Sequence, residues 1–117
     1  LGASVNDQTI DRLQCQIIAG GANNQLQNEV EHGERLVSKG VTYAPDFVIN
    51  AGGIINVYLD YLGEYNRDRA YAMAEDIYST TLNILDSAKT GGIPPQEAAI
   101  TRALSRIEKV GRIKLSF

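Results

Sequence analysis

Two short clusters of amides, glycines and small apolar residues are the strongest candidates for chemistry in this sequence. Residues 21–24 read Gly-Ala-Asn-Asn, and residues 50–57 read Asn-Ala-Gly-Gly-Ile-Ile-Asn-Val. Side-chain amides donate and accept hydrogen bonds without titrating. Ile54 and Val57 are three residues apart, so one face of a helix would present both to the same pocket. From spacing alone, ligand binding and plain turn chemistry both remain open.

Each cluster follows a predicted strand, which is where a parallel sheet binds its ligands. Residues 14–19 have a strand pattern that Gly20 and Gly21 break, and residues 41–44 form a second predicted strand before Pro45. Ligands of open parallel sheets bind beyond the carboxyl ends of the strands. We therefore expect the two clusters to lie side by side, with amides suited to a neutral carboxamide such as that of nicotinamide.

The elements around these clusters follow from helix capping signals. Asn28 with Glu31 three residues on resembles a capping box, which predicts a helix over residues 29–38 that ends before Gly40. Asn50 is the expected N-cap of a further helix that ends near Gly63. The glycines in its first turn each cost up to about 1 kcal/mol relative to alanine. That cost suggests that another chain segment or a ligand approaches the backbone there.

Two long helices are predicted to close the chain. Asn66 caps the first, Gly91 and Gly92 stop it, and Pro94-Pro95 open the second. Their predicted apolar faces are Ala70, Met73, Ala74, Ile77, Thr81, Ile84, Leu85 and Ala88, then Ala99, Ile100, Ala103, Leu104, Ile107 and Val110. The fold class is α/β: a partial Rossmann-like parallel sheet with flanking helices, like half of a doubly wound domain, and two long C-terminal helices.

Other reactive or aromatic residues have simpler explanations. His32 lies among glutamates on a predicted helix and is expected at the surface or an interface. Cys15 is expected to be buried in a strand. Tyr58, Tyr61 and Tyr65 follow at helical spacing, which predicts core or subunit packing. One histidine and one cysteine do not make a zinc site.

Composition excludes several classes of protein. The 117 residues are 44% hydrophobic and 21% charged, with a formal charge of −3. This charge argues against nucleic-acid binding, and the apolar runs are shorter than the ~20 residues of a membrane helix. The single cysteine predicts a cytoplasmic location. Five of the basic residues gather near the C-terminus, which we expect to be a solvated helix end: Arg102, Arg106, Lys109, Arg112 and Lys114.

The chain carries an ordered set of segments at residues 1–7, 17–26, 32–33, 43–57 and 65–67. With these segments it resembles the C-terminal part of the leucine dehydrogenases, within the glutamate/leucine/phenylalanine/valine dehydrogenase family. The resemblance covers nearly the whole chain, and the segment at 43–57 is specific. It implies that residues 1–117 are the C-terminal half of a dinucleotide-binding domain. The upstream catalytic domain and the glycine-rich pyrophosphate turn are absent from this sequence, which starts at Leu1.

The resemblance implies an NAD-dependent oxidative deamination of an apolar L-amino acid to a 2-oxo acid and ammonium. A hydride passes from the substrate Cα to nicotinamide C4, while the two lysines and the aspartate of the family lie in the other domain. This fragment is therefore expected to hold no catalytic residue and to be inactive alone. The family is oligomeric, so a homo-oligomer is expected.

The resemblance also assigns roles to the two clusters. It implies cofactor binding by Ala22, Asn23, Asn24 and Asn50, with Asn24 also touching the substrate. Ile54 and Val57 would line the pocket for the substrate side chain, with leucine, isoleucine, valine, phenylalanine and tryptophan all open. The side-chain carboxylate of a glutamate substrate would need a positively charged partner in this pocket, and these two apolar side chains do not provide one. The alternative function is a noncatalytic helical interaction module that kept the fold without the cofactor.

Overall fold

The structure is a computed structural model that describes residues 2–63 and 65–114, without the side chains of residues 113 and 114. Leu1 and the side chain of Lys114, both used in the sequence analysis, lie outside the described residues. The elements in chain order are η1 (Ile10–Arg12), β1 (Ile17–Ile18), α1 (Glu29–Ser38), β2 (Thr42–Tyr43), α2 (Asp46–Ile49), α3 (Gly52–Tyr61), α4 (Arg67–Gly91) and α5 (Pro95–Lys114).

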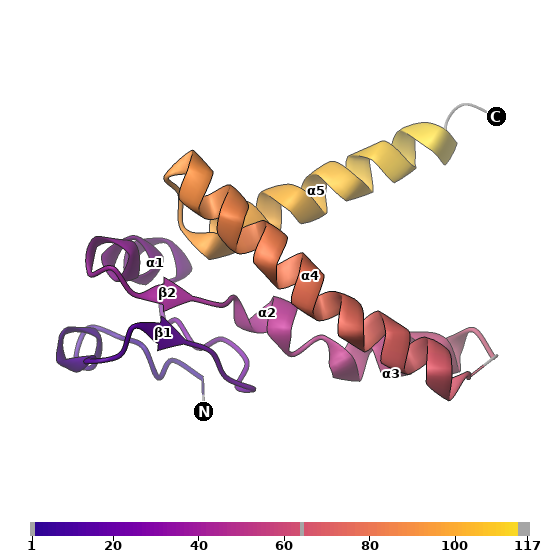
Figure 1. The fold of residues 1–117 in the computed structure, drawn as a ribbon, viewed down its shortest axis with the longest axis horizontal. Helices are drawn as coiled ribbons and strands as arrows, with labels where there is room; N and C mark the ends of the chain where they lie inside the picture. The colour runs from indigo at the N-terminus through magenta and orange to yellow at the C-terminus, as the bar shows by residue number, and fades with distance from the viewer. Residues whose placement is uncertain (1, 64, 115–117) are drawn as a thin grey trace.

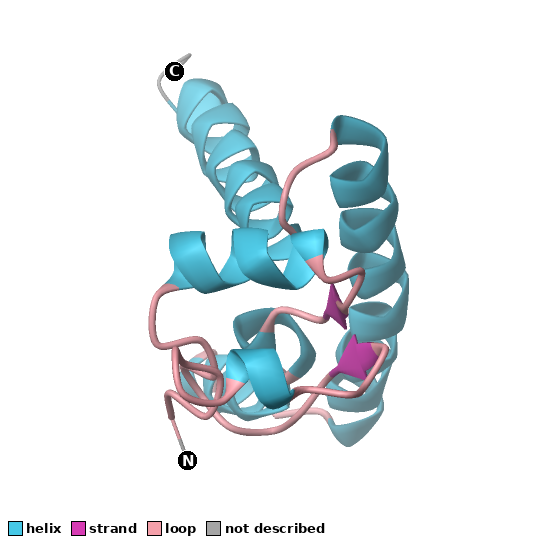
Figure 2. Ribbon diagram, turned by 90° about the vertical axis from the view of Figure 1, so that its left-hand side faces the viewer, coloured by secondary structure: helices cyan, strands magenta, loops and turns pink. Residues whose placement is uncertain are grey.

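The two strands form a small parallel sheet joined through α1, which confirms the predicted βαβ unit and the α/β class. Ile17 pairs with Thr42, and Ile18 pairs with Tyr43. Figure 1 shows this sheet and α1 at one end of the molecule, with α3, α4 and α5 extending away from it. In Figure 2 helices dominate, and the strands form one small patch. The predicted strands over residues 14–19 and 41–44 are too long, because the ladder pairs only two residues of each.

The helix ends follow local capping chemistry where it was predicted. The Asn28 side chain accepts hydrogen bonds from the backbone N–H groups of Val30 and Glu31, and α1 covers the predicted residues 29–38. Asn66 caps α4 in the same way through Arg69 N–H, and Gly92 ends it with a φ of 63°. Glycine suits that left-handed position because it has no Cβ.

The segment around Asn50 differs from the prediction. A one-turn helix, α2, comes first, and Asn50 is its C-cap. Ala51, which makes no side-chain cap hydrogen bond, is the N-cap of α3. The prediction that Asn50 caps α3 is therefore wrong. The physical reason is Pro45, whose fixed φ of −57° suits the start of a helical turn five residues earlier than expected.

Two separate apolar cores hold the fold together. The first lies between the sheet, α1 and the N-terminal segment and comprises Val5, Ile10, Leu26, Leu36, Val41 and Tyr43. The second joins α4 to the start of α5 and comprises Ile84, Ala88, Ala98 and Ala99. Val48 of α2 packs on the second core. Because α2 touches the helical core while following β2 directly, it links the two halves of the chain.

Several predicted burials are wrong. His32 is buried, at 2% exposure, rather than at the surface. Cys15 is exposed and not buried in a strand, since it precedes β1, which begins at Ile17. Tyr58, Tyr61 and Tyr65 are exposed, so the prediction that they pack in the core does not hold within the described residues, whereas their packing against another subunit stays a prediction. On α5, most of the predicted apolar face is exposed as well, namely Ile100, Leu104, Ile107 and Val110. Within the described residues, no helix has the length and hydropathy needed to cross a bilayer.

Candidate functional site

The two predicted clusters meet at the carboxyl end of the sheet. The Asn50 side-chain N–H₂ donates to Asn23 Oδ1 at 2.5 Å and to the carbonyl of Gly21 at 3.3 Å. These contacts join residues that are 27 and 29 positions apart in the chain. The structure thus brings the predicted amides together on one face, as the strand-end argument expected.

Asn24 occupies a distinct backbone conformation in the loop after β1. Its φ is +52°, in the left-handed region that asparagine tolerates better than most residues. Its carbonyl accepts a hydrogen bond from the Ala3 N–H at 2.7 Å. Asn23 and Asn24 are exposed, whereas Ala22 and Asn50 are half-buried. The loop therefore presents an open polar face, with Ala22 as its apolar neighbour.

Ile54 and Val57 lie on the outer face of α3. They are 72% and 68% exposed, although both are apolar. Tyr58 and Tyr61 are also exposed, so positions 54, 57, 58 and 61 form a continuous apolar stripe at helical spacing. We call these four residues the α3 stripe. The stripe lies on α3, whereas the amide loop follows β1, so the two surfaces come from different elements.

Three glycines at the two clusters have open space where a side chain would be. A Cβ built on Gly21, Gly52 or Gly53 would meet no heavy atom within 4 Å. None of the three has a positive φ. Neither the local backbone conformation nor packing within the described chain therefore requires glycine here. The backbone therefore has no side chain over it in the loop where the amides converge (Gly21) and at the start of α3 (Gly52 and Gly53).

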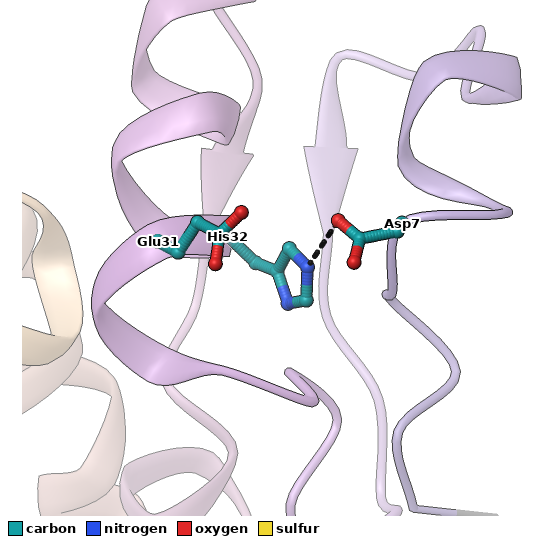
Figure 3. Close-up of side chains that lie close together, drawn as sticks. All are labelled: Asp7, Glu31 and His32. Carbon is teal, nitrogen blue, oxygen red and sulfur yellow. Dashed lines mark hydrogen bonds and ion pairs between the residues drawn. The ribbon is translucent and has the colours of Figure 1, made fainter.

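His32 and Asp7 form a polar network away from the amide loop (Figure 3). The His32 Nδ1 accepts from the Asn28 N–H at 3.0 Å, so Nε2 carries the proton and faces Asp7 Oδ1 at 3.3 Å. Arg35 donates to the same Asp7 oxygen at 2.6 Å. These hydrogen bonds, first from His32 and then from Arg35, lower the pKa of Asp7 below 3.8. Both ring nitrogens are engaged, so the histidine joins the N-terminal segment to α1.

A metal site at this network is disfavoured. Ligand atoms of Asp7, Glu31 and His32 lie within 4.8 Å of one another. In Figure 3 the Asp7 carboxylate points at the imidazole, whereas the Glu31 carboxylate stands beside it. The imidazole and Arg35 already satisfy the Asp7 carboxylate, and the guanidinium supplies the positive charge that a cation would bring.

Comparison with known proteins gives the family. The profile of the Glutamate/Leucine/Phenylalanine/Valine dehydrogenase family matches residues 1–112. The chain belongs to this family. It is 50% identical over its whole length to the leucine dehydrogenase of Thermoactinomyces intermedius. It is also 44% identical over 95% of its length to the phenylalanine dehydrogenase of Bacillus thermotolerans.

A solved structure supports the same assignment for the fold. The crystal structure of L-tryptophan dehydrogenase from Nostoc punctiforme superposes with a TM-score of 0.90 at 46% identity over 96% of this chain. The matched region is 33% of that chain, 31% of the leucine dehydrogenase and 28% of the phenylalanine dehydrogenase. The chain thus spans about a third of the length of the relatives that it matches.

Sequence reasoning missed two features of the site. The hydrogen bond from Asn50 to Asn23 was not predicted, because Asn50 was expected to cap α3 and not to end α2. The second feature is Asp46, which is buried and binds the loop through its carboxylate. Its position directly after Pro45 at the end of a predicted strand was the available signal, since a buried acid needs partners.

Proposed function

We propose that this chain is the nicotinamide-facing part of the dinucleotide-binding domain of an NAD-dependent L-amino-acid dehydrogenase. The reaction would convert an apolar L-amino acid, NAD⁺ and water into the 2-oxo acid, ammonium, NADH and a proton. The family match and relatives named for leucine, phenylalanine and tryptophan support this reaction class. The observation that carries the proposal is the Asn50 side chain bound to the loop after β1.

The residues at the two clusters fit a flat neutral amide. Asn23 and Asn24 are exposed at a strand end, next to the bare backbone of Gly21, Gly52 and Gly53. A bare backbone lets a flat ring approach closely, and amide side chains can match both the donor and the acceptor of a carboxamide. Ala22, Asn23, Asn24 and Asn50 are accordingly the proposed cofactor-binding residues.

The α3 stripe supplies the proposed substrate surface. Ile54 and Val57 would contact the side chain of the amino acid, and Asn24 would touch both substrate and cofactor. An apolar surface rejects a charged substrate side chain, because burying an unpaired carboxylate is unfavourable. The exposure of Ile54 and Val57 supports this role, since a covering group from outside the chain would remove them from water.

The bound cofactor would supply the hydride acceptor at its nicotinamide ring. The chain's own residues would hold and orient it: the amides fix the carboxamide, and the apolar side chains exclude water from the reacting carbon. Holding two reactants in a fixed geometry is a large part of such catalysis. The proton-transferring groups would come from the part of the protein outside these residues, so residues 1–117 alone would not turn over substrate.

The exposed apolar surfaces also bear on the rest of the protein. The exposed apolar residues of α5, together with Tyr58 and Tyr61 of the α3 stripe, would be covered by the rest of the protein or by a second subunit of a homo-oligomer. No observation favours the alternative of a noncatalytic helical module. A cytoplasmic location stays a proposal.

A turnover assay on the full-length protein tests the proposed function. The purified enzyme is incubated with NAD⁺ and each of L-leucine, L-isoleucine, L-valine, L-phenylalanine, L-tryptophan and L-glutamate, and NADH formation is followed by its absorbance. We expect turnover with at least one apolar substrate and little with glutamate. A folded protein that reduces NAD⁺ with none of the apolar amino acids would contradict the proposal.

A further inference from the structure

The peptide group between Asn24 and Gln25 is held at both of its polar atoms. Its carbonyl oxygen accepts from the Ala3 N–H at 2.7 Å. Its N–H donates to Asp46 Oδ2 at 3.0 Å. A peptide plane that is fixed at both ends cannot rotate freely, so the ψ angle of Asn24 is fixed with it. The direction of the Asn24 side chain depends on that backbone geometry.

The holding carboxylate is itself buried and rigid. Asp46 is 5% exposed, and its other oxygen accepts from the Phe47 N–H at 2.7 Å. The backbone N–H of Asp46 lies 3.3 Å from the hydroxyl of Tyr43. A buried carboxylate with two backbone N–H donors is strongly fixed, because hydrogen bonds to charged groups are stronger than neutral ones.

Asp46 and Asn50 together hold the loop from both sides. Asp46 is the first residue of α2, and Asn50 is the C-cap that follows its last residue. Asp46 binds Gln25 at one end of the loop, while Asn50 binds Gly21 and Asn23 toward the other. A single helical turn thus spans the loop and contacts it at two points.

We propose that Asp46 is a positioning residue that acts through Asn24. By accepting the Gln25 N–H, it keeps Asn24 in its left-handed conformation and aims the exposed amide at the ligand face. Without this contact the loop could relax toward ordinary backbone angles, because asparagine tolerates a positive φ better than most residues but still favours negative values. This inference rests on the proposed function, in which Asn24 touches cofactor and substrate.

Asp46→Asn in the full-length enzyme is the first test. Asparagine has the same shape but only one acceptor oxygen, so one of the two N–H donors would face an N–H₂ group. We expect kcat/KM for the amino acid to fall about tenfold, because the free energy of one hydrogen bond to a charged group corresponds to a change of about that size. Asp46→Ala, which removes both acceptors, should have a larger effect in the same direction.

A double-mutant cycle separates positioning from general loss of structure. If Asp46 works through Asn24, Asp46→Asn should reduce kcat/KM by less than about twofold in an Asn24→Ala background, because the side chain that it positions is gone. Fully additive losses in the double variant would overturn the proposal. So would unchanged kinetics of both Asp46 variants in an active enzyme.

Leu36→Ala is the matched control for destabilisation. Leu36 is fully buried in the first core, and its apolar side chain cannot hydrogen-bond to the loop. We expect it to lower the melting temperature but to leave kcat/KM within about twofold of wild type. An equal loss of kcat/KM in Leu36→Ala and Asp46→Asn would overturn the positioning role. A wild-type enzyme without any turnover would instead contradict the proposed function, so the two failures are distinguishable.

Discussion

Three asparagines meet at the candidate site, and each contributes a different property. Asn24 tolerates a left-handed backbone conformation, Asn50 donates through its N–H₂ group, and Asn23 accepts through its side-chain oxygen. Aspartate could replace neither the donor at position 50 nor the neutral surface that a carboxamide ligand needs. The residue types therefore follow from what each position has to do.

Ile54→Ala tests the proposed substrate contact. Removing most of an apolar side chain from a pocket weakens binding of a small substrate and makes room for a larger one. We expect the ratio of kcat/KM for leucine to that for phenylalanine to fall by roughly tenfold or more, measured by NADH formation. Val30→Ala on α1, which is also exposed, is the control and should leave the ratio unchanged. An unchanged ratio in Ile54→Ala would remove Ile54 from the site.

The Asp7 network predicts how stability depends on pH. Hydrogen bonds from His32 and Arg35 lower the pKa of Asp7, so the folded state binds this proton less readily than the unfolded state. The contribution is present above the unfolded value of 3.8 and is lost as the pH falls through the lowered folded pKa. The difference in melting temperature between wild type and Asp7→Ala should shrink below pH 3.8. A difference that stays constant through this range would contradict the role of the ionised carboxylate.

At the scale of elements, α2 determines the site although it is only one turn long. Its two ends hold the loop after β1, and its Val48 packs on the core between α4 and α5. The position of the loop is therefore tied to the long helices.

Gly53→Ala tests whether the bare backbone at the start of α3 serves a ligand. Alanine is the better helix former, so the change should stabilise the protein by up to about 1 kcal/mol. It should also weaken NAD⁺ binding, because a Cβ would occupy the space that is open in this structure. Thermal melts and NAD⁺ titrations measure the two effects.

Gly111→Ala in α5 is the matched control for this change. Its Cβ would also meet no heavy atom within 4 Å, and it lies far along the chain from the site. We expect a similar gain in stability with unchanged NAD⁺ affinity. Equal NAD⁺ affinity in both glycine variants would contradict a ligand role for Gly53.

The elements that the sequence predicted well are those with local causes. The caps at Asn28 and Asn66 and the stop at Gly92 act within one or two turns, so their residue types are sufficient to place them. The helix α2 and the burial of His32 depend on partners 21 to 25 positions away, which local patterns do not contain. The convergence of the amides was predictable, because strand-end geometry is a property of the whole fold class.

At the scale of the whole molecule, the chain is more open than a complete domain. Its radius of gyration is 16.2 Å, whereas a compact domain of this length has about 13 Å. In Figure 1, α5 runs away from the sheet and from α3. This openness accounts for the exposed apolar face of α5. Periodicity predicts that a face will be covered, but not whether the cover lies within these 117 residues.

Leu104→Lys tests whether the exposed face of α5 is covered in the full-length protein. Leu104 is 60% exposed here. If the rest of the protein covers Leu104, a lysine at this position would bury an unpaired ammonium group. The unfolding free energy should then fall by about 2 kcal/mol or more. Ser105→Lys, at a neighbouring exposed polar position, should have little effect. Equal melting temperatures for both variants would show that this face stays in water.

The central claim is that Asn50 and the loop after β1 bind the nicotinamide amide, and Asn50→Ala in the full-length protein tests it most directly. The measurement is the dissociation constant of NAD⁺ beside that of ADP-ribose, which has the same diphosphate and adenosine but no nicotinamide. The account predicts that NAD⁺ binds about tenfold more weakly to the variant, as expected for one lost hydrogen-bonding group, with ADP-ribose unchanged. Equal losses for both ligands, or no loss for either, would contradict it.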